Sequence, residues 1–171
     1  GGLAAVAGND TKVLSVVETA NYLAQKGFDA VGLNFGGEAT VGGVKFAVTQ
    51  AIHTNSTTEN GKAVYGGLAC GFVLAADGKS VYFAGDTDVF SDMALIKEFY
   101  SPDIAILPVG GWYTMDVKKA VYACNRLLKP KYLIPMHFDT FPAIKADLSP
   151  LSCDLETAKA IILKDGDSAD F

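Results

Sequence analysis

The sequence predicts an α/β domain in which helices pack against a mixed β-sheet, and two patterns carry this prediction. Before Asp86, β-branched or alternating runs are separated by glycine-rich turns, which is typical of antiparallel strands. After Asp86, apolar runs alternate with helical stretches, which is typical of parallel strands joined by helices. With 171 residues, 50% of them hydrophobic, the chain is long enough to bury a substantial core. We therefore expect a single domain over residues 1–171.

The first half of the chain is expected to hold one helix among strands. Residues 12–17 are rich in β-branched side chains, and residues 18–26 have apolar positions at helical spacing before Gly27, a common C-terminal cap. The Asp77-Gly78 pair predicts a tight hairpin. Residues 54–62 are expected to form a polar loop. Further extended segments are expected at 30–35, 44–52, 68–76 and 80–84.

Helices and strands are expected to alternate in the second half. Two helices are predicted, over residues 91–99 and 116–128, with Asp116 as the N-cap of the second. Apolar strands are predicted at 104–109 and 132–136. In the tail we expect a helix over 156–160 and a final strand over 161–163.

Composition and charge narrow the classes of partner. A formal charge of −5 and a pI near 4.9 argue against binding to nucleic acid or to an anionic membrane, because such binding needs clustered Lys and Arg. The sequence shows no apolar run of membrane-spanning length and no signal-peptide pattern, so we expect a cytoplasmic protein. A small-molecule substrate is the expected partner, and a homo-oligomer is left open. The three cysteines, Cys70, Cys124 and Cys153, lack paired spacing and are expected to be ordinary reduced thiols that are mostly buried.

Three side chains suited to metal binding follow apolar strands. His53 and His137 are the only two histidines, and Asp86 lies in the Gly-Asp-Thr sequence after residues 80–84. Taken singly, each has a simpler interpretation: a solvated histidine, an Asx turn and a core histidine. Taken together, their placement favours a site built at strand ends, where α/β proteins hold their ligands. His53, Asp86 and His137 are therefore the candidate metal ligands.

A candidate pocket wall lies beside these strand ends. Gly111, Trp112 and Tyr113 follow the strand at 104–109, and Phe138 follows His137. The glycine would let the backbone approach a ligand while an aromatic ring forms a wall. The alternative is a tight loop whose aromatic rings pack on the rim. Asp139 is a candidate to orient a histidine ring, with a turn role as the alternative.

Several long motifs resemble the metallo-β-lactamase superfamily, and they cover nearly the whole chain. These motifs are AGDTDVFSDMALI, PDIAILPVGGWYTM, LKPKYLIPMHFDTFPAI, FGGEATVGGVKFAVTQAIHTNS and VLSVVETANYLAQKG. The branch they resemble is an uncharacterised group of metal-dependent hydrolases related to ascorbate-phosphate lactonase. The resemblance implies an αβ/βα sandwich with mixed sheets and helices on the outer faces.

The resemblance also implies roles for the candidate ligands. His53 would bind the first of two divalent metal ions, His137 the second, and Asp86 would bridge both, which makes it the catalytic residue. The His-x-His-x-Asp-His segment of the family has no counterpart here, so we expect an N-terminally truncated domain. Zinc is the expected metal, with manganese or iron as alternatives. Because each ion would keep few protein ligands, we expect this chain alone to bind metal weakly or not at all.

Three functional hypotheses remain. The resemblance favours a hydrolase in which metal-bound hydroxide attacks an ester, a lactone or a phosphorylated small molecule, inactive as this isolated fragment. The alternative is a non-catalytic binding or oligomerisation module that kept the fold without the metal segment. A nucleic-acid-processing role is disfavoured by the acidic composition.

Overall fold

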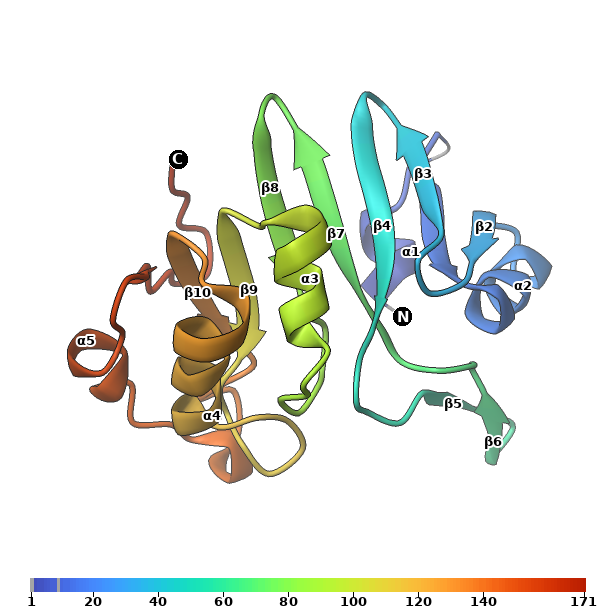
Figure 1. Cartoon of the computed structure of the whole chain (residues 1–171). Coiled ribbons are helices and arrows are strands. Elements are labelled where there is room, and N and C mark those ends of the chain that lie inside the picture. The colour runs from blue at the N-terminus through green and yellow to red at the C-terminus, as the bar shows by residue number, and fades with distance from the viewer. Residues whose placement is uncertain (1, 9) are drawn as a thin grey trace.

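The computed structural model describes residues 2–8 and 10–171, and these residues contain a seven-stranded mixed sheet with the order β11-β10-β9-β8-β7-β4-β3 (Figure 1). Strands β3, β4, β7 and β8 pair antiparallel, whereas β8, β9, β10 and β11 pair parallel. The predicted mixed α/β fold is thus confirmed. The strands are β3 (Glu38–Val41), β4 (Val44–Gln50), β7 (Cys70–Ala76), β8 (Lys79–Phe83), β9 (Ile104–Pro108), β10 (Tyr132–Met136) and β11 (Lys159–Ala160).

Helices cover one face of this sheet, with α3 and α4 in front of it in Figure 1. Their apolar sides pack on β8, β9 and β10 in a core that includes Tyr82, Met93, Leu107 and Leu133, all fully buried. Asp116 caps α4 as predicted, because its carboxylate accepts the Lys119 N–H at 2.8 Å. The helices are α3 (Met93–Tyr100), α4 (Val117–Tyr122), the π-helix η1 (Ala123–Leu128), the 3₁₀ helix η2 (Pro142–Ile144) and α5 (Pro150–Cys153).

The N-terminal part forms two smaller sheets. After α1 (Gly2–Val6), β1 (Lys12–Val16) runs straight into α2 (Val17–Gln25), and β2 (Asp29–Leu33) pairs parallel with β1. A hairpin of β5 (Ser56–Glu59) and β6 (Lys62–Tyr65) projects from the body at the lower right of Figure 1. Hydrogen bonds from Thr19 and Asn55 to the Gly66 carbonyl tie the base of this hairpin to α2.

Three predictions about local structure are wrong. Residues 54–62 are not a polar loop, since they contain β5 and the turn into β6. Residues 156–160 are not helical; the last helix is α5, which begins at Pro150, a residue well suited to a first helical turn. The final strand is Lys159–Ala160 rather than 161–163, because the free edge of β10 accepts it in parallel register. Strand β3 was not among the expected strands, which left residues 36–43 unassigned.

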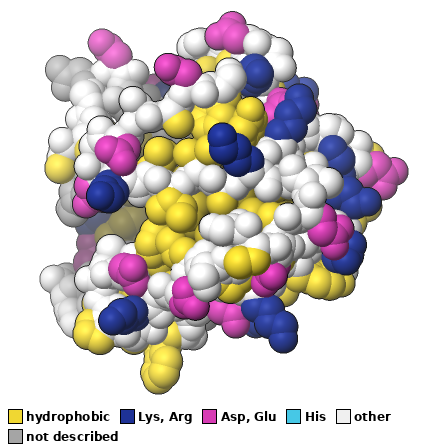
Figure 2. Space-filling view, turned by 90° about the vertical axis from the view of Figure 1, so that its left-hand side faces the viewer, with side chains coloured by type: hydrophobic (Ala, Val, Ile, Leu, Met, Phe, Trp, Pro, Cys, Tyr) yellow, Lys and Arg dark blue, Asp and Glu magenta, His cyan; other side chains and the backbone are white. Residues whose placement is uncertain are grey.

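The other face of the sheet is only partly covered. An apolar groove of about 360 Å³ runs between this face and β1. Its sheet side is lined by Val41, Phe46, Phe72, Leu74, Val81, Phe83 and Ile106, and its β1 side by Lys12 and Leu14. Seen from the side of the molecule that carries β10 and α5, hydrophobic side chains gather in the middle with charged side chains around them (Figure 2). In the residues described, none of the helices has the length and apolar character needed to span a membrane.

Candidate metal centre

The three candidate ligands follow strands that point the same way. Strand β10 is parallel to β9 and β9 to β8, while β4 and β8 are each antiparallel to β7. Strands β4, β8 and β10 therefore end at one edge of the sheet. His53 lies three residues after β4, Asp86 three residues after β8, and His137 directly after β10. The strand-end argument made from the sequence thus describes the topology correctly.

Asp86 and His137 face each other across this edge. Asp86 Oδ2 lies 3.7 Å from His137 Nε2, which is longer than a hydrogen bond. His137 has a φ of 53°, an uncommon value for a non-glycine residue. Its carbonyl presses on Gly110, where an added Cβ would lie 2.2 Å from the His137 oxygen. The backbone around His137 is therefore tightly constrained, and a glycine is required at position 110.

His53 shares a polar pocket with Asp86. The pocket measures about 310 Å³ and is also lined by Ser15, Thr19, Thr54, Asn55, Ser56, Ala69 and Cys70. The His53 Nδ1 atom lies 2.7 Å from the Thr54 carbonyl oxygen, to which it can only donate. In a neutral ring this contact selects the tautomer with the proton on Nδ1, which leaves the lone pair of Nε2 for a metal ion.

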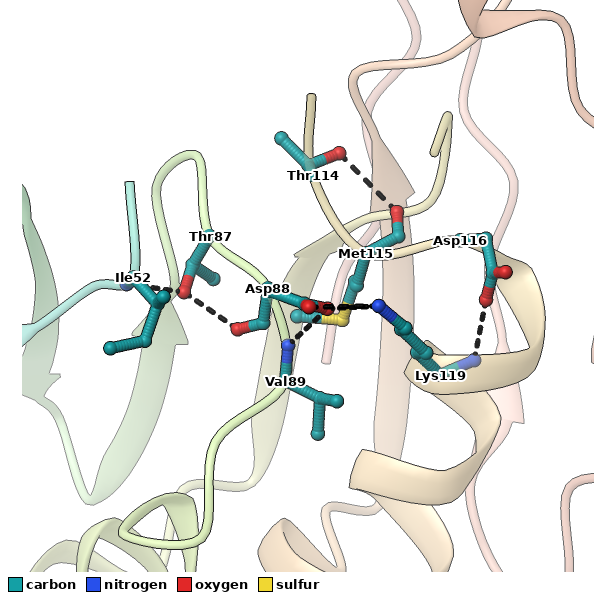
Figure 3. A network of polar contacts seen from close by, with 8 residues as sticks. All are labelled: Ile52, Thr87, Asp88, Val89, Thr114, Met115, Asp116 and Lys119. Atoms are coloured by element: carbon teal, nitrogen blue, oxygen red, sulfur yellow. Dashed lines mark hydrogen bonds and ion pairs between the residues drawn. The ribbon is translucent and has the colours of Figure 1, made fainter. Parts of the chain in front are cut away.

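A hydroxyl that the sequence reasoning missed holds two of these strand ends together. Thr87 is fully buried, and its Oγ1 accepts the Ile52 N–H at 2.8 Å and donates to the Asp88 carbonyl at 2.7 Å (Figure 3). The Thr87 carbonyl in turn accepts the Met115 N–H at 2.9 Å. Thr87 directly follows Asp86, and its hydroxyl binds the residue before His53. The two segments that carry these candidate ligands are therefore joined in one network. The Gly-Asp-Thr sequence was the available signal, but it gave no partner for the threonine.

An ion pair anchors the same loop to helix α4. Lys119 Nζ lies 2.8 Å from both oxygens of Asp88, and Asp88 Oδ1 also accepts the Val89 N–H (Figure 3). Partial burial tends to raise the pKa of Asp88, but the Lys119 ammonium and the Val89 N–H outweigh it and lower this pKa. The segment that follows Asp86 is therefore held in place from both sides.

The candidate pocket residues take different positions. Trp112 and Tyr113 are 79% and 56% exposed, after Gly111 with its φ of 66°. Phe138 is half-buried and packs against the hydrophobic core. Asp139 accepts the Ala146 N–H, a turn contact of the kind considered as its alternative role.

The cysteines differ in exposure. Cys124 is buried, and burial raises its pKa to about 12, whereas Cys70 is half-buried in the polar pocket and Cys153 is exposed. The expectation that the thiols are mostly buried therefore holds for Cys124 and fails for Cys153.

Imidazole and carboxylate groups suit a divalent cation, but the structure brings Asp86 next to His137 without gathering His53 into one cluster with them. Two ligands of one tetrahedral zinc ion lie roughly 3.3 Å apart, given metal–ligand distances of about 2.0–2.1 Å. The Asp86–His137 separation is a little longer than this. The Nδ1 atom of His137 is buried without a hydrogen-bond partner. Within residues 2–8 and 10–171, no three His, Cys, Asp or Glu side chains lie close enough together to hold a metal ion.

The fold is a mixed sheet backed by helices, and the comparisons with known proteins identify the class of protein that carries it. The family model described as a beta-lactamase superfamily domain matches residues 6–138. A UPF0173 metal-dependent hydrolase of Methanoculleus marisnigri is 45% identical over 160 residues, covering 92% of this chain and 71% of the relative. A UPF0173 metal-dependent hydrolase of Methanosarcina barkeri is 40% identical over 163 residues, covering 94% of this chain and 70% of the relative.

A solved structure shows the same relationship. Igni18, a metallo hydrolase from Ignicoccus hospitalis, superposes with a TM-score of 0.76 at 36% identity, covering 92% of this chain and 67% of that one. The chain therefore belongs to the metallo-β-lactamase superfamily, with UPF0173 metal-dependent hydrolases among its homologues.

Proposed function

We propose that this chain carries one side of the metal centre of a hydrolase that acts on a small ester, lactone or phosphorylated molecule. The observation that carries the proposal is the convergence of Asp86 and His137 at one sheet edge, with His53 in the same pocket as Asp86. Homology to metal-dependent hydrolases supports the reaction class. Zinc is proposed first, with manganese or iron as alternatives, because imidazole and carboxylate ligands suit all three.

Each side chain has a defined part in this proposal. His53 would bind through Nε2, because Nδ1 donates to the Thr54 carbonyl. The Asp86 carboxylate would be shared between two ions, and His137 would bind the second ion through Nε2, the atom that faces Asp86. The bound cations would supply Lewis acidity and activate water for attack. Thr87 would keep the first two ligands in register through its bond to the Ile52 N–H.

The test is a metal titration read from the two histidine rings. Because the chain has only His53 and His137, the imidazole nitrogen resonances in an NMR spectrum report on the site alone. We expect Zn²⁺ to shift both Nε2 resonances with weak affinity. Asp86→Asn should lower the affinity for Zn²⁺ about tenfold or more, since it removes a charged ligand. Asp165→Asn in the exposed tail should leave the affinity unchanged.

Two results would contradict the proposal. One is that both imidazoles stay unmoved up to millimolar Zn²⁺. The other is that they shift equally in the Asp86→Asn variant, because Asp86 would then not share the ion with them.

A second candidate function is a non-catalytic binding or oligomerisation module, and the apolar groove is the observation that favours it. Unmoved imidazoles together with a stable dimer in sedimentation would support the module over the hydrolase. A cytoplasmic location and a homo-oligomer stay predictions of the sequence.

A further inference from the structure

Three aromatic side chains from two separate loops form an exposed cluster beside His137. Trp112 and Tyr113 lie in the loop after β9, and Phe141 lies in the loop after β10; they are 79%, 56% and 43% exposed. The Trp112 and Tyr113 ring centroids are 6.5 Å apart, and those of Tyr113 and Phe141 are 6.3 Å apart. We call Trp112, Tyr113 and Phe141 the aromatic platform.

The aromatic platform is fastened to the candidate metal centre. In the loop after β9, the Gly111 N–H donates to the Met115 carbonyl, and the Met115 N–H donates to the carbonyl of Thr87, next to Asp86. Gly110 packs against the carbonyl of His137. The loop after β10 therefore begins at His137 itself, and the loop after β9 is hydrogen-bonded to the residue that follows Asp86.

The backbone at Trp112 is unfavourable for a tryptophan. Its φ is 59°, a left-handed conformation that costs a non-glycine residue on the order of 1 kcal/mol. Burial cannot repay this cost, since the side chain is mostly exposed. An exposed aromatic ring adds no packing that would stabilise the folded chain. A strained and exposed aromatic residue next to a candidate active site therefore indicates a binding role.

The charged residues of the two loops limit the chemical class of the ligand. Residues 110–116 and 137–144 contain Asp116 and Asp139 but neither Lys nor Arg. Phosphate recognition relies on cationic side chains or helix N-termini, whereas clustered aromatic rings bind flat or apolar rings. The two loops therefore suit an uncharged ring better than an anionic group.

We propose that the aromatic platform binds an uncharged, ring-bearing part of the substrate, so that the hydrolase acts on esters or lactones that carry an aromatic or flat apolar ring. This inference rests on the proposed function. It narrows that function, because it disfavours a phosphate group at this side of the site. A second copy of the chain on the platform is the competing occupant.

The test uses Trp112, the only tryptophan in the chain, as the reporter. Benzyl alcohol is titrated into the metal-free chain, and tryptophan emission is followed, with glycerol as the ringless control. We expect a saturable change with benzyl alcohol and none with glycerol. Tyr113→Ala and Phe141→Ala should each weaken binding about three- to tenfold, because each removes one aromatic neighbour. Phe99→Ala, at a residue that is 72% exposed on α3, is the matched control and should change nothing.

The inference is overturned if emission fails to saturate, or if Phe99→Ala weakens binding as much as the platform variants do. It is also overturned if emission shifts with protein concentration alone, because the platform would then contact a second copy. Binding of the probe needs no metal, and Asp86→Asn should retain it. Failure here is thus distinct from failure of the metal titration, which tests the proposed function.

Discussion

The hydroxyl of Thr87 shows how a single side chain can position two candidate ligands. Thr87 is fully buried and satisfies the Ile52 N–H, so the isosteric Thr87→Val change removes the partner of that donor and also the hydrogen bond to the Asp88 carbonyl. We expect Thr87→Val to lower the free energy of unfolding by about 1–3 kcal/mol. Urea denaturation measures the loss. Thr87→Ser keeps the hydroxyl and should lose less, and an equal loss in both variants would point to the methyl group instead.

Trp112 offers a test of backbone strain that is separate from side-chain contacts. Trp112→Ala and Trp112→Gly both remove the indole, but only glycine adopts a φ of 59° without steric cost. We therefore expect the glycine variant to be more stable than the alanine variant by about 1 kcal/mol. Thermal and urea unfolding of the pair measure this difference. Equal stabilities would mean that the loop relaxes and stores no strain at Trp112.

At the level of elements, the sequence predicts the strands and helices that have strong periodicity and misses those set by tertiary pairing. The buried strands β9 and β10 and the capped helix α4 are found because their apolar patterns or end signals are local. Strand β11 is two residues long and exists through its bonds to the edge of β10, which no local pattern encodes. The β5–β6 hairpin is rich in polar residues, so its strands resemble a loop in the sequence.

The features of the candidate site also divide into those that local sequence predicts and those that depend on tertiary contacts. The positions of His53, Asp86 and His137 after strands could be predicted, because strand ends are a local feature. The supporting contacts could not, since Thr87 with Ile52 and Lys119 with Asp88 join residues 31 or more positions apart. Phe141 joins Tyr113 for the same reason, through the meeting of two loops.

Asp103 links the starts of three strands and should make stability depend on pH. Its carboxylate lies 2.8 Å from Lys131 Nζ and accepts the Ser80 N–H, so the pKa of Asp103 is lowered. A lowered pKa means that this stabilisation is complete above the ordinary aspartate pKa and is lost as the pH falls through the lowered value.

We expect Asp103→Asn to cost on the order of 1 kcal/mol at neutral pH, where the ion pair and the charged acceptor are lost. The variant should also lose less stability than the parent chain on acidification, because the titrating group is gone. Urea unfolding at a series of pH values measures both effects. Parallel pH profiles for the two proteins would show that Asp103 is not the group responsible.

The whole molecule has two unlike faces. Helices bury the side of the sheet that holds Tyr82 and Leu107, while the opposite side keeps Phe46, Phe72 and Phe83 in a groove. The candidate ligands lie at the edge between these faces. The sheet that carries the candidate site at its edge thus has a second face that is apolar and accessible, a feature that favours contact with another apolar surface.

This open face should bind an apolar dye while the chain remains folded. Phe83 lines the groove and is 40% exposed, whereas Phe99 is 72% exposed on α3, away from it. We expect the dye anilinonaphthalene sulfonate to fluoresce with the native chain and Phe83→Ala to remove most of that emission, because the ring supplies contact area in the groove. Phe99→Ala should have little effect, and circular dichroism should show that both variants keep their secondary structure. If the two variants lose the same emission, the dye binds elsewhere, and the groove does not act as an accessible apolar surface.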